Sequence, residues 1–356
     1  MTTTTSTTMM TTAMTPASPP TVQEQAPVLL GHAAGYVCAR TIAMGLRHGL
    51  VAAVADAGEQ GVSADGLAEQ LGLDPFYVGV WCQAGLAAGV LDRTADGFRA
   101  APHMATLLLD TTSPAFVGGL FRVFEQPELF QRFDDELASG DRLWWDQCSH
   151  DWIAGVAGTG TPFYVRLVPN GLAVVPDVDE RLRAGGRVLD LACGAGSGLQ
   201  RLAETYPAAS VVGVDGDRHS LELAARRLRD AGLSHRVSLV HSTVEELQVE
   251  EPVDVVINNI SMHECRDIDR ATQRVYEALA AGGTFVISDF PFPDSDEGLR
   301  TPPGRVMAGI QFFEAQIDDQ LVPRSRYDTL LSRHGFVGLG NHTISPVHAL
   351  TWGRRR

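Results

Sequence analysis

One segment limits the fold of this chain more than any other. The apolar run RVLDLA (187–192) leads into a glycine-rich stretch that ends at Gly198, and the amphipathic run LQRLAETYP follows directly. Glycines between a strand and a helix let the backbone turn sharply and approach a ligand closely, and the helix start offers unpaired N–H groups. The segment therefore predicts a ligand-binding βαβ unit, although a purely structural glycine turn is the alternative.

The residues after this loop continue the alternation of strands and helices. Apolar runs end near Asp215, Ser242, Asn259 and Phe290, and a helical pattern follows each run. Such alternation predicts a parallel sheet covered by helices on both faces. The final two apolar runs are joined by too short a link for a crossover helix, so we expect them to form an antiparallel hairpin at the sheet edge.

The region before the sheet predicts a small helical domain. Residues 27–58 have a helical pattern, Ser63 can cap a short helix that Gly72 ends, and Asp74 followed by proline starts another helix. Two short strands around Gly97 would complete a winged helix. The second short helix contains no arginine or lysine, so it cannot hold phosphates, and we expect a structural or dimerising role instead of DNA binding.

Composition excludes several classes of protein. The net charge of −15 argues against sequence-independent binding to nucleic acid or anionic lipid. The five cysteines are scattered without C-x-x-C spacing, which favours a reducing cytoplasm. No apolar run approaches the roughly 18 to 20 residues that span a bilayer. Residues 1–27 are rich in Thr, Met, Ser and Pro, and we expect them to form a disordered tail.

The motifs VLDLACGAGSG, VVGVD and LAAGGTFVISD resemble those of the class I S-adenosylmethionine-dependent methyltransferases. The region before the sheet resembles the dimerisation domain of small-molecule O-methyltransferases of bacterial natural-product type. The resemblance implies an α/β fold with a Rossmann-like, seven-stranded sheet that is mostly parallel with an antiparallel last strand, after an α-helical winged-helix domain. It also implies S-adenosyl-L-methionine as cofactor, a small-molecule methyl acceptor and a homodimer formed through the N-terminal domain.

These observations divide the chain into four expected parts. They are a disordered tail (1–27), a winged-helix dimerisation domain (28–110), a helical linker and substrate-pocket region (111–182), and an S-adenosylmethionine-binding methyltransferase domain (183–356).

An acidic residue at the end of the second strand is suited to hold a ribose. Asp215 can accept two hydrogen bonds from a ribose diol. The chain departs from the family pattern in two places. Ala192 replaces the first glycine of the family loop, and Ser242 and Thr243 stand at the end of the third strand, where the family often has an Asp that binds the adenine amino group. The predicted cofactor-binding residues are Asp190, Ala192, Gly194, Gly196, Gly198, Asp215, Gly216, Ser242, Thr243, Asn258 and Asn259.

A histidine follows the fourth strand, where ligands of open parallel sheets bind. His263 occupies the place of the proton-accepting base in the plant-like O-methyltransferases, and imidazole suits that task near neutral pH. The alternative is that His263 stands at a helix start and forms its hydrogen bonds with the backbone. Glu314 is our candidate for the carboxylate that orients this base, and a solvated helix position is its alternative.

A metal-assisted reaction is a further alternative, because some bacterial relatives with this layout act on 2-oxo acids with bound iron. His263, Glu264, Glu314 and His342 could meet at one site, but no short ligand spacing supports this, and we predict no metal. O-, N- and C-methylation all remain open. A winged-helix regulator that senses the cofactor is the alternative of a different class.

Aromatic side chains are frequent between the two predicted domains. They either pack the junction or line an apolar pocket for the acceptor, since such pockets favour domain junctions. The predicted acceptor-binding residues are Trp144, Trp145, Phe163, Tyr164, Met262 and Phe313.

Overall fold

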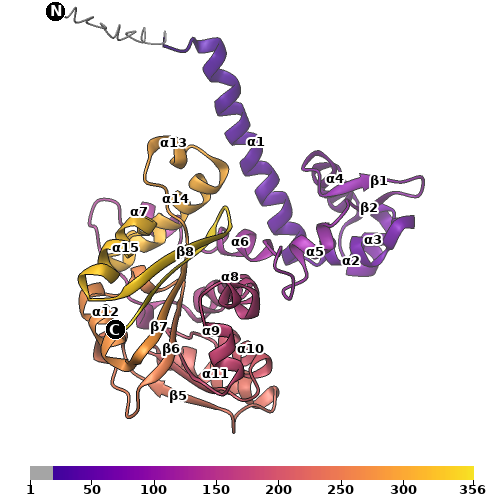
Figure 1. Cartoon of the computed structure of the whole chain (residues 1–356). Coiled ribbons are helices and arrows are strands. Elements are labelled where there is room, and N and C mark those ends of the chain that lie inside the picture. The colour runs from indigo at the N-terminus through magenta and orange to yellow at the C-terminus, as the bar shows by residue number, and fades with distance from the viewer. Residues whose placement is uncertain (1–18) are drawn as a thin grey trace, which may run out of the picture.

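A seven-stranded sheet forms the centre of the larger part of the molecule, and a helical N-terminal part lies beside it (Figure 1). The computed structural model of the chain describes residues 19–356. The strand order is β5-β4-β3-β6-β7-β9-β8. The strands are β3 (Arg187–Leu191), β4 (Ser210–Asp215), β5 (Val237–His241), β6 (Val253–Asn259), β7 (Leu279–Asp289), β8 (Val337–Ser345) and β9 (His348–Arg354).

The pairing of these strands confirms the predicted fold class. Strands β3 to β7 pair in parallel, whereas β9 pairs antiparallel with both β7 and β8. The chain runs outward from β3 to β5 and then returns to β6 on the other side of β3. Ligands of open α/β sheets bind at such a reversal of strand order, outside the carboxyl ends of the strands.

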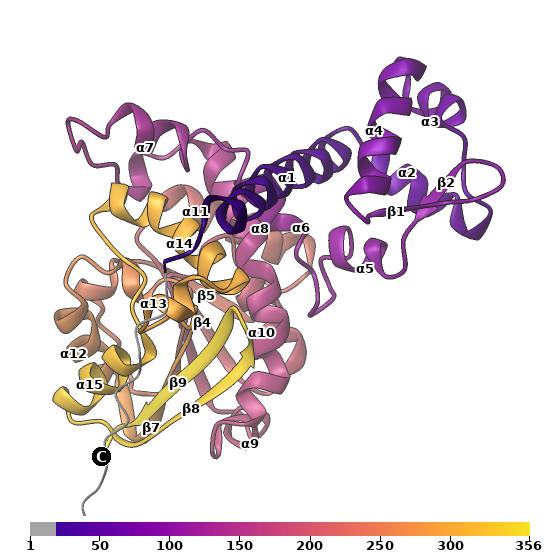
Figure 2. The same cartoon turned by 90° about the horizontal axis from the view of Figure 1, so that it is seen from above.

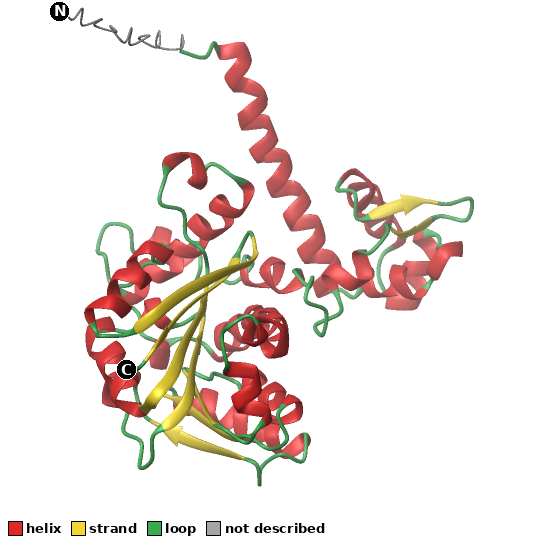
Figure 3. Ribbon diagram, viewed as in Figure 1, coloured by secondary structure: helices red, strands yellow, loops and turns green. Residues whose placement is uncertain are grey.

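Helices cover both faces of the sheet (Figures 1 and 3). One core, around Leu199, Leu202 and Leu228, joins one face to four helices, and another, around Val275 and Leu331, joins the opposite face to two helices. Apolar strands buried on both faces explain why these runs lack polar alternation. The first group is α8 (His150–Arg166), α9 (Val178–Arg183), α10 (Ser197–Thr205) and α11 (Arg218–Asp230), and the second is α12 (Ile268–Ala278) and α15 (Arg324–Arg333).

The N-terminal part contains the expected helix-turn-helix and hairpin. Ser63 caps its first short helix, Gly72 ends it in a left-handed conformation, and Asp74 caps the next helix with proline in its first turn. The winged-helix assignment and the domain boundaries at 110 and 182 stay predictions. The elements here are α1 (Val22–Arg47), α2 (Leu50–Asp56), η1 (Gly58–Gln60), α3 (Ala64–Leu71), α4 (Pro75–Ala87), β1 (Leu91–Arg93), β2 (Phe98–Ala100) and α5 (Met104–Leu108).

The predicted tail was too long at its C-terminal end. Helix α1 already begins at Val22, because Thr21 and Glu24 form a reciprocal capping box, and Pro27 lies inside the helix. The rest of the predicted tail, residues 1–18, lies outside the described residues. Helix α1 extends away from the sheet (Figures 1 and 2). No single helix among residues 19–356 is long and apolar enough to cross a membrane; α1 and α2 pass that test only as a pair bent by 74°.

Short helices and loops connect the two parts and lie over the carboxyl ends of the strands. They contribute, with α8, to a third apolar cluster around Leu129, Trp152 and Phe313. The remaining elements are α6 (Gly118–Val123), α7 (Gln131–Asp135), η2 (Trp145–Gln147), η3 (Leu167–Gly171), η4 (Val244–Glu246), η5 (Met262–Glu264), α13 (Asp296–Leu299), α14 (Pro302–Glu314) and η6 (Ala315–Ile317).

The close packing of α8 on the glycine-rich loop depends on Gly198, which has no side chain. A Cβ atom on Gly198 would lie 2.1 Å from the Tyr164 ring, whereas one on Gly309 of α14 meets nothing within 4 Å. We therefore expect Gly198→Ala to lower the free energy of unfolding by about 1–3 kcal/mol through overpacking. The matched control Gly309→Ala should raise it by about 0.5–1 kcal/mol, because alanine favours helix. Chemical denaturation measures both values, and equal effects of the two substitutions would contradict the close packing.

Candidate active site

The glycine-rich loop between β3 and α10 turns through three residues with positive φ. Their φ angles are +52° at Ala192, +52° at Gly194 and +78° at Gly196. Glycine adopts this region freely, whereas a residue with a Cβ does so at a cost of about 1–2 kcal/mol. Ala192 thus holds the left-handed conformation in spite of its side chain. Gly196 is the N-cap of α10, so the first N–H groups of that helix lie beside the loop.

Asp215 ends β4 and fastens this loop. Its Oδ2 accepts a hydrogen bond from Gly194 N at 2.8 Å, and its Oδ1 accepts one from Asp217 N at 2.8 Å. Burial raises the pKa of Asp215, and these two backbone donors counteract part of that rise. Each carboxylate oxygen has capacity for a further hydrogen bond, so Asp215 still has acceptor sites for the two hydroxyls of a ribose.

A buried hydrogen bond joins α8 to the start of the loop. The Tyr164 hydroxyl lies 2.9 and 3.0 Å from the two carboxylate oxygens of Asp190 and donates to them. Burial raises the pKa of Asp190 to about 7, although the hydrogen bond from Tyr164 lowers it. Asp190 therefore connects the start of the loop to α8.

The other predicted cofactor residues lie at the carboxyl ends of neighbouring strands. Ser242 N donates to the Asp215 carbonyl at 3.0 Å, and the Gly216 carbonyl lies 3.0 Å from His241 Nε2. Thr243 follows Ser242 and precedes η4. Asn258 and Asn259 end β6.

Two buried amide atoms at this edge support the presence of a polar ligand. Asn258 Nδ2 donates to the Leu191 carbonyl, but Asn258 Oδ1 and Asn259 Nδ2 have no hydrogen-bond partner among the described residues. An unpaired buried polar atom is costly, and a bound ligand removes that cost. Together with the loop and Asp215, these atoms are a set of donors and acceptors that fits S-adenosylmethionine.

His263 lies in η5 directly after β6, and its ring is fixed by two carboxylates. Its Nδ1 is 2.8 Å from Asp289 Oδ2, and its Nε2 is 3.7 Å from Glu314 Oε2. Asp289 also accepts hydrogen bonds from the hydroxyl of Tyr327 and from Phe290 N. An anion with these donors holds Nδ1 in its protonated form and leaves Nε2 as the reactive nitrogen.

The charge of His263 depends on these neighbours. Burial alone would lower its pKa, but the negative charges of Asp289 and Glu314 prevail and raise the pKa well above its ordinary value near 6.5. Burial and the charge of Glu314 raise the pKa of Glu264 well above its ordinary range. This end of the site therefore retains protons, and an arriving cation would favour their release.

Three of the four groups considered for a metal are adjacent. Ligand atoms of His263, Glu264 and Glu314 all lie within 4.8 Å of one another. Oε2 of Glu314 is buried without a hydrogen-bond partner among the described residues. His342 instead lies exposed on β8, outside this cluster. One imidazole and two carboxylates are a donor set that a divalent transition metal accepts.

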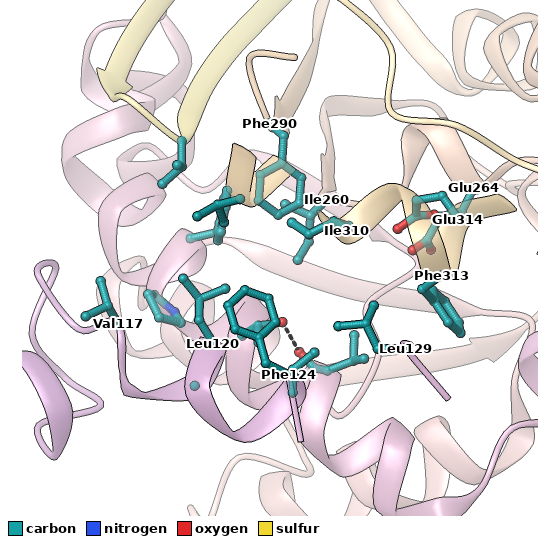
Figure 4. A pocket seen from close by; sticks show the side chains of 18 of the residues that line it. Val117, Leu120, Phe124, Leu129, Ile260, Glu264, Phe290, Ile310, Phe313 and Glu314 are labelled. Atoms are coloured by element: carbon teal, nitrogen blue, oxygen red, sulfur yellow. Dashed lines mark hydrogen bonds between the residues drawn. The ribbon is translucent and has the colours of Figure 1, made fainter. Parts of the chain in front are cut away.

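An apolar cavity opens beside His263 (Figure 4). It encloses about 940 Å³ of empty space, part of it open to solvent. Figure 4 shows Glu264 and Glu314 at one end and Val117 at the other. Its apolar lining comes from α6, α8, α14 and the loops between them, and includes Phe116, Leu120, Phe124, Trp145, Trp152, Phe163, Ile260, Phe290, Ile310 and Phe313.

The cavity contains only some of the predicted acceptor-binding residues. Trp145, Phe163 and Phe313 line it. Tyr164 and Met262 do not, because both side chains are buried in the cores on the two faces of the sheet. Trp144 also lies outside the lining, where the guanidinium of Arg266 stacks on its ring at 3.6 Å.

Sequence reasoning missed Asp289, the closer of the two carboxylates to His263. A signal for it was available, because Asp289 ends β7 and β7 pairs directly with β6. Parallel neighbours bring their carboxyl ends together. The cavity residues Phe124 and Ile310 carried no comparable signal, since apolar helix positions also fill cores.

Comparisons with known proteins agree with this geometry. A family described as "Methyltransferase domain" matches residues 182–331. Malonyl-[acyl-carrier protein] O-methyltransferase from Priestia megaterium is 28% identical over 103 residues, which cover 29% of this chain and 36% of that protein. The chain spans between about a fifth and a half of the length of the first curated relatives that it matches.

Solved structures match almost the whole chain. An O-methyltransferase family protein from Burkholderia thailandensis superposes with a TM-score of 0.67 at 18% identity, covering 93% of this chain and 98% of that one. Human N-acetylserotonin methyltransferase, solved in complex with S-adenosylmethionine, superposes with a TM-score of 0.71 at 15% identity. The match covers 95% of this chain and 99% of that one. At such identities the likeness shows the fold. Residues 182–331 therefore match a methyltransferase domain, and the described chain, with its helical N-terminal part, has the fold of these solved methyltransferases.

Proposed function

We propose that this protein transfers a methyl group from S-adenosylmethionine to a hydroxyl of a small, largely apolar and aromatic acceptor. The observation that carries the proposal is the position of His263, which lies between a buried carboxylate and an apolar cavity at the carboxyl end of β6. The cavity has the character of a small-ligand site, because its walls are mainly apolar and aromatic and polar groups converge at His263. A biosynthetic role and a cytoplasmic location are parts of the same proposal.

The chain's own residues would align the acceptor and remove its proton. When bound, S-adenosylmethionine supplies an activated methyl group and a positive charge. His263 Nε2 would accept the hydroxyl proton while Asp289 stabilises the imidazolium that results. Aromatic walls at Trp145, Phe163 and Phe313 would hold the acceptor away from water.

Cofactor binding is tested first, by calorimetric titration with S-adenosylhomocysteine. Wild-type protein should bind it, and Asp215→Ala should bind at least about tenfold more weakly, because hydrogen bonds to a charged group contribute strongly. Asp230→Ala, an exposed substitution at the end of α11, is the matched control and should leave affinity unchanged. Equal affinity of Asp215→Ala and wild type would refute the ribose assignment.

His263 is tested with an acceptor found by screening. His263→Ala should keep its affinity for S-adenosylhomocysteine while turnover falls by about two to four orders of magnitude. Because the pKa of His263 is raised, kcat/KM of the wild type should increase with pH through a midpoint above 6.5. Asp289→Asn should move that midpoint to lower pH, since the negative charge that favours the imidazolium is gone.

Two results would redirect this proposal. Unchanged turnover in His263→Ala would mean that the acceptor ionises unaided or that the base is another residue. Activity that a chelator abolishes and a divalent cation restores would favour the second candidate, metal-assisted methylation at His263, Glu264 and Glu314, including C-methylation of a 2-oxo acid or N-methylation.

The N-terminal part supports a further proposal, a homodimer. Helix α1 exposes an apolar stripe made of two residue pairs seven residues apart: Leu29 and Leu30 are 69% and 71% exposed, and Tyr36 and Val37 are 68% and 58% exposed. An apolar stripe at this spacing is typical of a helix that packs against a partner. We propose a second copy of this chain as that partner, and no nucleic acid or membrane.

Light scattering after size exclusion tests the dimer. The wild type should elute as a dimer, and Leu30→Glu combined with Val37→Glu should be monomeric, because two charges would be buried in the interface. Gly31→Glu adds a charge on the opposite face of the same helix, where a Cβ meets nothing within 4 Å, and should leave the dimer intact. A monomeric wild type, or a dimer that tolerates the double substitution, would contradict the proposed interface.

A further inference from the structure

The charged side chains that line the cavity lie at separate ends. Glu264 and Glu314 lie together at one end (Figure 4), and a ring nitrogen of His263 lies within 4.8 Å of both carboxylates. The one guanidinium in the described lining belongs to Arg166. The walls between are aromatic and aliphatic.

Arg166 lies toward the end that is remote from the carboxylates. It is the last residue of α8, and its Nη1 donates to the Pro114 carbonyl at 3.0 Å. Pro114 is three residues before Val117, which Figure 4 places opposite Glu264 and Glu314. The guanidinium also lies over the ring of Phe163, 4.8 Å from its centroid.

A buried network holds the guanidinium in one orientation. Arg166 Nε donates to His348 Nδ1 at 3.0 Å, so the proton of this neutral histidine is on Nε2. Nε2–H donates to the Ser288 hydroxyl at 2.8 Å, and that hydroxyl donates to Asn259 Oδ1 at 2.7 Å. Burial, together with the charge of Arg166, lowers the pKa of His348 to about 3, so His348 stays neutral.

Among the described residues, no carboxylate forms an ion pair with Arg166. None of the ion pairs among the described residues includes Arg166, and its Nη2 donates to none of these residues. Burial lowers its pKa, and no neighbouring carboxylate offsets this effect. A guanidinium stays charged in proteins, so a half-buried one beside apolar walls is stabilised by an incoming anion.

The geometry points to an acceptor that carries a carboxylate, which Arg166 binds at one end of the cavity while the methyl-accepting atom lies at His263. The inference rests on the proposed function and narrows its acceptor to aromatic or apolar acids. The carboxylate of Glu314 beside His263 disfavours the reverse orientation, because it repels the carboxylate of an acid that enters that way round. The fixed guanidinium requires little reorganisation to bind an anion.

Matched acid and amide probes test the inference without an identified acceptor. Phenylacetate is compared with phenylacetamide, and cinnamate with cinnamamide, by calorimetry in the presence of S-adenosylhomocysteine. The wild type should bind at least one acid about tenfold or more tightly than its amide, as expected for a charge-assisted hydrogen bond. Since the chain has a net charge of −15, non-specific attraction cannot produce this preference.

Variants separate the charge of Arg166 from its structural contacts. Arg166→Lys keeps the charge and should retain a preference for the acid, whereas Arg166→Met keeps only the apolar stem and should bind acid and amide equally. Arg229→Gln removes an exposed arginine of α11 and should behave as the wild type. Thermal unfolding and S-adenosylhomocysteine affinity report whether each variant is folded.

Three outcomes would overturn the inference. They are no preference of the wild type for either acid, no binding of either acid at millimolar concentration, and a preference that persists in folded Arg166→Met. Each of these leaves the proposed function standing if S-adenosylhomocysteine still binds. Failure of S-adenosylhomocysteine to bind the wild type would instead remove the proposed function, and the inference with it.

Discussion

The hydrogen bond between Tyr164 and Asp190 connects the two halves of the site. Tyr164 can reach the buried carboxylate only because Gly198 has no side chain, so α8 packs directly on the start of α10. The same turn of α8 presents Phe163 and Arg166 to the cavity. One helix therefore supports the glycine-rich loop on one face and forms a wall of the apolar cavity on another. A shift of α8 would alter both sites at once.

The charged side chains of the cavity are divided between its two ends. Carboxylates surround His263 and raise its pKa, so in the absence of ligands the imidazole holds its proton. The positive charge of S-adenosylmethionine would favour the neutral, basic form of His263. In the proposed reaction, the cofactor's charge would thus lower the pKa of His263, while Asp289 keeps the ring oriented. At the remote end, Arg166 is fixed by uncharged partners and stays available to an anion.

Local patterns predicted much of this architecture because their physical causes are local. Ser63 and Asp74 cap their helices as expected, since a capping side chain bonds to backbone only a few residues away. The same reasoning could have found the helix start at Val22, where Thr21 and Glu24 form a capping box, but the polar composition of the first 27 residues obscured it. Composition is a weaker guide than a specific cap.

The sequence by itself determined the parallel sheet, the glycine-rich loop, Asp215 and the position of His263 after β6, because strand periodicity, turn residues and strand ends are properties of contiguous segments. Only the tertiary structure decided which side chains meet His263 and which line the cavity. Asp289, Glu314 and Arg166 come from separate elements, and their proximity depends on strand order and helix packing. Tyr164 and Phe163 are neighbours in sequence, yet one supports the loop and the other faces the cavity, because successive helix residues point about 100° apart.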